Sequence, residues 1–112
     1  MTKVQAIVRE ERVEAIIERL WLIGVRGLTV SAVRGTGHGG GHKEVFRGAV
    51  YQVDFQRMIM LEWFGMDEHA DAVVRAIQQR GATGQVGDGR IFVQEVEEAV
   101  RIRTGERGPD AL

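Results

Sequence analysis

The chain has 112 residues, no cysteine and a formal net charge of −1. It is long enough for one small domain, and it can form neither disulfides nor thiolate sites. The near-neutral charge argues against a general nucleic-acid coat, which is normally basic. The apolar runs are too short to span a bilayer, and the charged N-terminal residues do not fit a signal peptide. These features predict a cytoplasmic protein in which residues 1–112 form a single domain.

The first third of the chain changes from a strand pattern to a helix pattern. Lys3–Arg9 alternates apolar and polar residues, as a half-buried strand does. From Glu11 the apolar residues recur with the period of an amphipathic helix. Gly24 and Gly27 are expected to end this helix, and Leu28–Val33 is predicted to be the second strand. The stripe of the helix consists of Val13, Ile16, Ile17, Leu20 and Trp21.

The remaining elements complete an α+β pattern. Tyr51–Phe64 is predicted to be a third strand, and Asp67 to be the N-cap of a second helix that ends near Arg80. Ile91–Val96 is predicted to be the fourth strand. The order β-α-β-β-α-β indicates a ferredoxin-like sandwich, in which two helices cover one face of a four-stranded antiparallel sheet. Trp63 and Phe64 suggest that a partner subunit covers the other face.

A long connection separates the second and third strands. Arg34–Phe55 contains six glycines, and two to five residues would be enough to join two antiparallel strands. Because connections of this length are usually functional or disordered, we expect the segment to carry function.

Three glycine-rich or basic pieces have the chemistry of a phosphate site. They are Gly35–His38, Gly84–Arg90 and the pair Arg101 and Arg103. Glycine lets backbone N–H groups approach phosphate oxygens, and arginine supplies planar bidentate donors. Neither glycine-rich piece has the spacing of a Walker loop or a dinucleotide fingerprint. On the residues alone, Asp88-Gly89 also fits an ordinary turn.

Other polar residues leave two interpretations open. Glu62 and Thr29 are either solvated strand residues or ligand contacts, because a buried acid needs a partner. His38 and His42 are a weak candidate metal pair, and solvated loop histidines are the simpler interpretation. No paired carboxylates and no Ser/His/Asp set stand out, so the sequence does not predict an enzyme.

Five segments, spread over nearly the whole chain, resemble the PII signal-transduction proteins (the GlnB/GlnK group). The chain is similar to a divergent member of this family. The match is strongest in the stretch TGQVGDGRIFV and in RIRTGE, which begin at Thr83 and Arg101. The other matching segments are Gly24–Val30, Gly35–Gly37 and Phe46–Phe55. The resemblance implies a homotrimer with three functional loops: a T-loop at about 37–54, a B-loop at about 82–90 and a C-terminal loop at about 100–112.

The same resemblance implies a regulator that binds adenine nucleotide in clefts between subunits and controls a transporter, enzyme or regulator through its T-loop. ATP or ADP is expected, AMP is a further candidate, and the role of Mg²⁺ stays open. Arg101 and Arg103 are expected to reach the phosphates from the neighbouring subunit. The implied contacts within one subunit are Thr29, Gly35, Gly37, His38, Glu62, Phe64, Gly87, Asp88, Gly89 and Arg90.

The chain departs from the family pattern where 2-oxoglutarate is bound. Gly39 stands in place of a glutamine that joins Mg-ATP to this ligand, and Met58 in place of a lysine that pairs with its carboxylate. Each lost charged contact is worth about 1.5–3 kcal/mol. We therefore expect 2-oxoglutarate sensing to be weakened or lost. The N-terminal turn of the family is also replaced, by Arg9-Glu-Glu-Arg12.

Modification and an alternative function complete the expectations. Tyr51 stands where some members are uridylylated, and Ala49 stands where others carry a phosphorylated serine. The alternative is a PII-like protein linked to metal efflux or inorganic-carbon uptake, whose His38/His42 loop responds to a metal or small anion. No direct nucleic-acid contact and no membrane insertion are expected.

Overall fold

The computed structural model describes residues 1–36 and 55–112. Its strands are β1 (Thr2–Val8), β2 (Thr29–Gly35), β3 (Gln56–Gly65) and β4 (Gly89–Glu95). Its helices are α1 (Val13–Leu22) and α2 (Asp67–Gly81), with two 3-10 turns, η1 (Glu10–Arg12) and η2 (Gly108–Ala111). This order is the predicted β-α-β-β-α-β.

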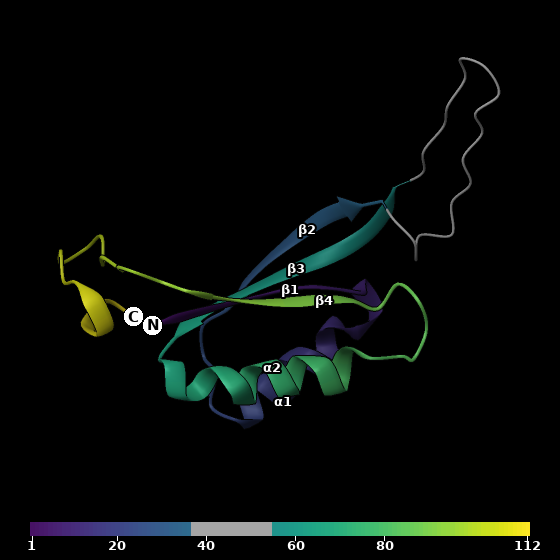
Figure 1. The fold of residues 1–112 in the computed structure, drawn as a ribbon, viewed down its shortest axis with the longest axis horizontal. Coiled ribbons are helices and arrows are strands. Elements are labelled where there is room, and N and C mark those ends of the chain that lie inside the picture. The colour runs from purple at the N-terminus through teal and green to yellow at the C-terminus, as the bar shows by residue number, and fades with distance from the viewer. Residues whose placement is uncertain (37–54) are drawn as a thin grey trace, which may run out of the picture.

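The four strands form one sheet in the order β2-β3-β1-β4, and every neighbouring pair is antiparallel. Both helices lie on the same side of this sheet (Figure 1). The predicted ferredoxin-like sandwich is therefore confirmed. One face of the sheet packs on the helices, and we call the other the helix-free face.

The core lies between the sheet and the two helices. In β1 every second residue is buried, which is the alternation expected of a strand with one covered face. Leu61 of β3 and Ile16 and Leu20 of α1 are fully buried, and Val73 and Ile77 of α2 are 1% exposed. Trp21, which was predicted to belong to the buried stripe, is 44% exposed.

Helix α1 ends at Gly24 through its backbone. Gly24 has φ +99°, a conformation that a residue with a Cβ rarely adopts. The N–H of Val25 bonds the carbonyl of Leu20 at 3.0 Å, and the N–H of Gly24 bonds that of Trp21 at 3.1 Å. This pair of bonds is a Schellman motif, and the buried Val25 supplies its hydrophobic contact. The predicted stop at Gly24 is confirmed.

The prediction that Asp67 caps α2 is wrong. Met66 is the N-cap residue, without a side-chain hydrogen bond, and Asp67 is the first residue of the helix. The Asp67 carboxylate instead accepts a hydrogen bond from the Thr2 hydroxyl at 2.5 Å and lies 3.1 Å from the N-terminal ammonium. The carboxylate therefore ties the helix to the start of β1.

Trp63 and Phe64 lie on opposite faces of the sheet. Trp63 is 8% exposed and belongs to the core, whereas Phe64 is 47% exposed on the helix-free face. The Trp63 ring lies over Gly65, where a Cβ atom would come within 2.1 Å of it. Trp63 therefore does not contribute to the helix-free face, contrary to the prediction.

The bounds of β1, β2 and β4 differ from the predicted ones by one to two residues, and Phe55, which was predicted to lie in the third strand, precedes β3. β2 runs two residues further than predicted, to Gly35, and β4 begins at Gly89, which pairs with Val8 of β1. The described part of the third strand starts at Gln56; residues 51–54 lie outside the described residues.

Candidate functional site

The predicted site residues lie in three separate places along the sheet. The 82–90 loop and Gly35 are at one end, although on opposite edge strands. Thr29, Glu62 and Phe64 lie further along the helix-free face. The C-terminal loop extends beyond the opposite end (Figure 1). A single chain therefore does not bring all of these residues together.

The Asp88 carboxylate organises the 82–90 loop. Its Oδ2 accepts hydrogen bonds from the backbone N–H groups of Thr83 at 2.7 Å and Gly84 at 3.0 Å. Its Oδ1 accepts from the Thr83 hydroxyl and from Nε of Arg9, the latter at 2.8 Å. The hydrogen bond from the Thr83 hydroxyl, followed by that from Arg9, holds the pKa of Asp88 well below its usual range. Asp88 is therefore an anion near neutral pH, and it holds the turn through four hydrogen bonds.

Glycines give this loop its path. Gly84, Gly87 and Gly89 have φ values of +87°, +104° and +102°. At Gly89 the backbone passes so close to β1 that an added Cβ would lie 1.7 Å from the carbonyl oxygen of Ile7. Arg90 follows with an exposed side chain. A chain of this kind can turn backbone N–H groups toward an anion, beside a guanidinium group.

Thr29 and Glu62 are directly opposite each other on β2 and β3. Glu62 faces Gln5 on its other side, and all three residues lie on the helix-free face. Lys3 Nζ lies 3.1 Å from Glu62 Oε2 and 5.8 Å from the centre of the Phe64 ring. Lys3 therefore joins two of the predicted contacts. The alternation of β1 placed it on this face, but the sequence did not single it out.

The pKa of Glu62 lies below its ordinary value of 4.5, chiefly because Lys3 bonds the carboxylate; partial burial acts in the opposite direction. The carboxylate therefore contributes stability at neutral pH, and this contribution is lost as the pH falls through the lowered pKa. We expect the wild type to exceed Glu62→Gln in unfolding free energy by no more than about 1 kcal/mol at neutral pH, because the pair is partly solvated.

Urea denaturation at neutral pH and well below pH 4.5 checks this expectation. The difference between the two proteins should shrink in acid. Lys3→Gln should remove the same pH-dependent part of the stability. A difference that stays constant over this range would contradict the role of the Lys3–Glu62 pair.

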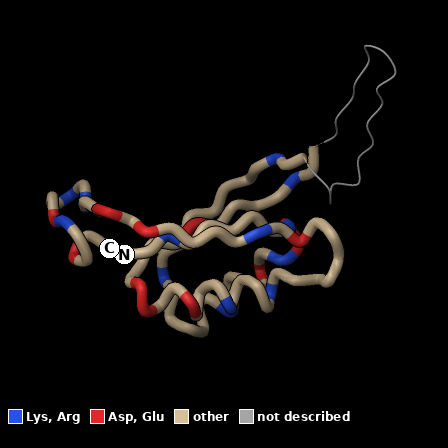
Figure 2. Tube along the Cα trace, in the orientation of Figure 1, with Lys and Arg blue, Asp and Glu red and all other residues tan. Residues whose placement is uncertain are grey.

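The C-terminal loop is held by its own contacts. Arg101 Nη1 donates to Glu106 at 2.7 Å and Arg101 Nη2 donates to the Leu112 carbonyl at 3.1 Å. Ile102 is fully exposed, and Arg103 is exposed beside it. Basic residues thus lie at both ends of the sheet (Figure 2). Arg101 and Arg103 do not approach the 82–90 loop of their own chain.

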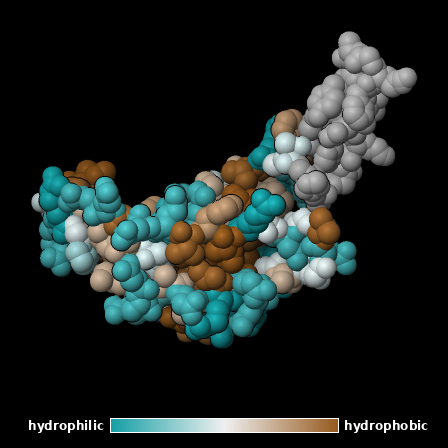
Figure 3. Space-filling model, viewed as in Figure 1, coloured by the Kyte–Doolittle hydropathy of each residue, from teal (hydrophilic) through white to brown (hydrophobic). Residues whose placement is uncertain are grey.

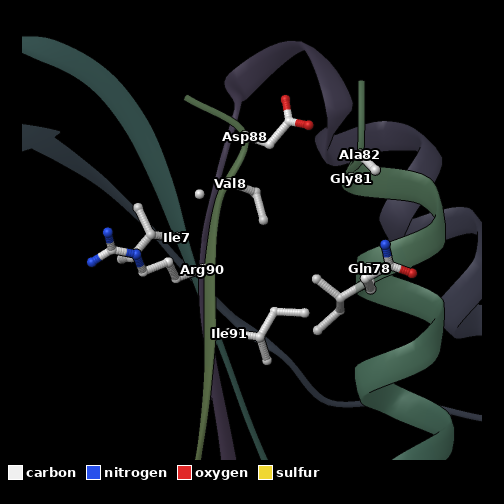
Figure 4. A pocket seen from close by; sticks show the side chains of 10 residues that line it. Ile7, Val8, Gln78, Gly81, Ala82, Asp88, Arg90 and Ile91 are labelled. Atoms are coloured by element: carbon white, nitrogen blue, oxygen red, sulfur yellow. The ribbon is translucent and has the colours of Figure 1, made fainter. Parts of the chain in front are cut away.

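A cleft of about 270 Å³ lies between β1, β4 and the end of α2. Its lining includes the apolar side chains of Val8, Ile77 and Ile91. In Figure 4 the side chain of Arg90 points away from the side on which Gln78 and Ile91 lie. Asp88, Gly89 and Arg90 of the 82–90 loop also line this cleft, although the Arg90 side chain extends away from it.

β4 is an edge strand, and Figure 3 shows an apolar patch beside it. Phe92 and Val93 of β4 are 47% and 56% exposed and lie on opposite faces of the sheet, because they pair with Gln5 and Val4 of β1.

Several predicted residues lie outside the described residues: Gly37, His38, His42, Gly39, Ala49 and Tyr51. Within residues 1–36 and 55–112, no three histidine, acidic or cysteine side chains are grouped as a metal site requires. The helices of the same ranges are too short or too polar to cross a membrane.

The fold defines a ferredoxin-like α+β protein with a glycine-rich loop at one end of its sheet. Residues 1–106 match the family model described as Nitrogen regulatory protein P-II. The nitrogen regulatory proteins P-II of Rhizobium meliloti (strain 1021) and of Rhodospirillum rubrum are each 45% identical over 112 residues, covering 100% of both chains.

A solved structure supports the same family. The crystal structure of Arabidopsis thaliana PII bound to citrate matches with a TM-score of 0.80 at 36% identity, over 99% of this chain and 91% of that chain. The chain belongs to the nitrogen regulatory protein P-II family. Members of this family are signalling regulators and not enzymes.

Proposed function

We propose that this chain is a PII signalling regulator of nitrogen or related metabolism. It binds ATP or ADP in clefts between the subunits of a homotrimer and controls a partner protein through residues 37–54. The observation that carries the proposal is the 82–90 loop. Its glycines at positive φ and the exposed Arg90 are suited to phosphate groups, and Asp88 fixes the path of the loop through hydrogen bonds to Thr83 and Gly84.

The position of the remaining residues supports a site shared between chains. Thr29 and Glu62 are adjacent on the helix-free face, which leaves a hydroxyl and a carboxylate next to each other for a base. Arg101 and Arg103 lie beyond the other end of the sheet. They contribute to a phosphate site only if a second copy brings its C-terminal loop to the 82–90 loop.

Calorimetric titration with ATP, ADP and AMP tests the proposal, with light scattering to give the oligomeric state. We expect a trimer that binds nucleotide. The double variant Arg101→Ala/Arg103→Ala should lower the affinity for ATP by at least about tenfold, because hydrogen bonds to charged groups are lost. A monomer that binds ATP, or a double variant with wild-type affinity, would contradict a shared cleft.

We also propose that 2-oxoglutarate is sensed poorly. Met58 of β3 is 7% exposed and pairs with Val33 of β2. Its thioether has no charge to pair with a carboxylate. Gly39 provides no side-chain oxygen for Mg²⁺. Adding 2-oxoglutarate with Mg-ATP should therefore produce no further heat of binding. Micromolar binding that depends on Mg-ATP would overturn this point.

The same titrations separate the alternative function. Zinc or copper binding that is lost in His38→Ala/His42→Ala, in a protein without nucleotide affinity, would replace the proposed nucleotide sensor by a metal-responsive protein.

A further inference from the structure

Arg9 is the residue that ties the 82–90 loop to the sheet. It follows the last residue of β1, and 79 positions separate it from Asp88. Its Nε donates to Asp88 Oδ1 at 2.8 Å, and its Nη2 donates to the Val86 carbonyl at 2.9 Å. Its side chain is 17% exposed. One guanidinium group thus holds the loop at two points, a backbone carbonyl and the central carboxylate.

The charge of Arg9 matters as much as its geometry. The Asp88 carboxylate stands between Gly87 and Gly89, where the proposed site receives phosphate groups. A carboxylate at that place repels phosphate unless a cation compensates it. Among the described residues, Arg9 forms the ion pair that the structure gives to Asp88. The pair removes the net charge of the acid while leaving its hydrogen bonds to the loop in place.

A lysine could not reproduce this arrangement. The two bonds leave Arg9 from different nitrogens of a planar group, in directions that the guanidinium fixes. An ammonium group is a single point with rotatable donors, so it would bond one acceptor well and leave the other. Residue 9 therefore requires arginine for both tasks.

We propose that Arg9 is a positioning residue for phosphate binding: it braces the 82–90 loop and offsets the charge of Asp88. This inference rests on the proposed nucleotide function of the loop. Arg9 does not itself contact the ligand in this proposal. It acts through Asp88 and through the backbone of Val86.

The test compares wild type, Arg9→Gln, Arg9→Lys and the control Arg12→Gln by calorimetry with ATP, ADP and AMP. Arg12 is a suitable control because its Nε also donates to a backbone carbonyl, that of Arg80 at 2.8 Å. We expect Arg9→Gln to lower the affinity for ATP by at least about tenfold. The affinity for AMP should fall distinctly less, because repulsion by Asp88 grows with the charge of the ligand. Arg9→Lys should be intermediate, and Arg12→Gln should stay within about threefold of wild type.

Two further measurements complete the test. Asp88→Asn in the Arg9→Gln background should recover part of the ATP affinity, because the amide removes the charge and keeps one oxygen acceptor for the N–H groups of Thr83 and Gly84. A loss of equal size for all three nucleotides, or a loss matched by Arg12→Gln, would overturn the proposal.

Hydrogen exchange of the Thr83 and Gly84 amides distinguishes failure of this inference from failure of the proposed function. It needs no ligand, and it should be faster in Arg9→Gln than in wild type. Wild-type protein that binds no nucleotide would refute the function. Unchanged exchange in Arg9→Gln would refute the bracing role.

Discussion

Replacing Leu61 by alanine is expected to lower the free energy of unfolding by about 2–5 kcal/mol, because it leaves a cavity in a closely packed core. Leu61 is fully buried at the centre of β3, where its neighbours are Ala6 of β1 and Val30 of β2 in the sheet register. Since Ala6 is already small, little side-chain volume is available to close the cavity.

Chemical denaturation at one fixed protein concentration measures this effect, because an oligomer gains stability with concentration. Leu22→Ala is the matched control: it removes the same atoms from a side chain that is 70% exposed at the end of α1. It should change stability by no more than about 0.5 kcal/mol. Equal effects of the two substitutions would contradict the assignment of Leu61 to the core.

Replacing Gly89 by alanine is expected to separate the start of β4 from β1. The added Cβ would lie 1.7 Å from the Ile7 carbonyl oxygen, so the backbone itself must move. A positive φ costs a residue with a Cβ about 1–2 kcal/mol, and overpacking adds about 1–3 kcal/mol. Hydrogen exchange in β4 and chemical denaturation would both register the change.

Gly84→Ala isolates the steric part of this effect. Gly84 also has a positive φ, but nothing lies within 4 Å of its added Cβ. The variant should therefore lose only the conformational part, about 1–2 kcal/mol. If Gly84→Ala and Gly89→Ala were equally destabilised, the close approach of the loop to β1 would be excluded.

The element order could be predicted because the periodicities are long and regular. The alternation in β1 and the stripes of both helices depend on which residues are apolar, and these patterns are local. The third strand was harder, because Met58–Phe64 is apolar at nearly every position and so does not show which residues face the helices. Trp63 lies on the helix side because it pairs with the buried Val4 of β1, and Gly65 leaves room for its ring.

Local patterns also missed the partners that are distant in sequence. Asp67 has the sequence signature of an N-cap, and nothing nearby reveals that Thr2 and the chain terminus would engage its carboxylate. Arg9 likewise looks like a charged residue after a strand. Its role becomes visible only when the antiparallel pairing of β1 with β4 brings it to Asp88.

The candidate site was predicted chiefly from the chemistry of residue types and from family resemblance. The glycine-rich 82–90 loop and the pairing of Thr29 with Glu62 are arranged in a way that fits that prediction. Lys3, Arg9 and Thr83 were not predicted, because each acts through a hydrogen bond or ion pair to a predicted residue and lacks a motif of its own.

The distance between the 82–90 loop and the C-terminal loop has a consequence for dilution. Each chain supplies the 82–90 loop to one proposed phosphate site and its C-terminal loop to another, at opposite ends of its sheet. A separated subunit would therefore hold no complete site. The apparent affinity for ATP should then fall as the protein is diluted toward the dissociation constant of the subunits. Bound ATP should in turn favour the assembled oligomer. The fraction of sites occupied by ATP would therefore depend on the concentration of the protein as well as on that of the nucleotide.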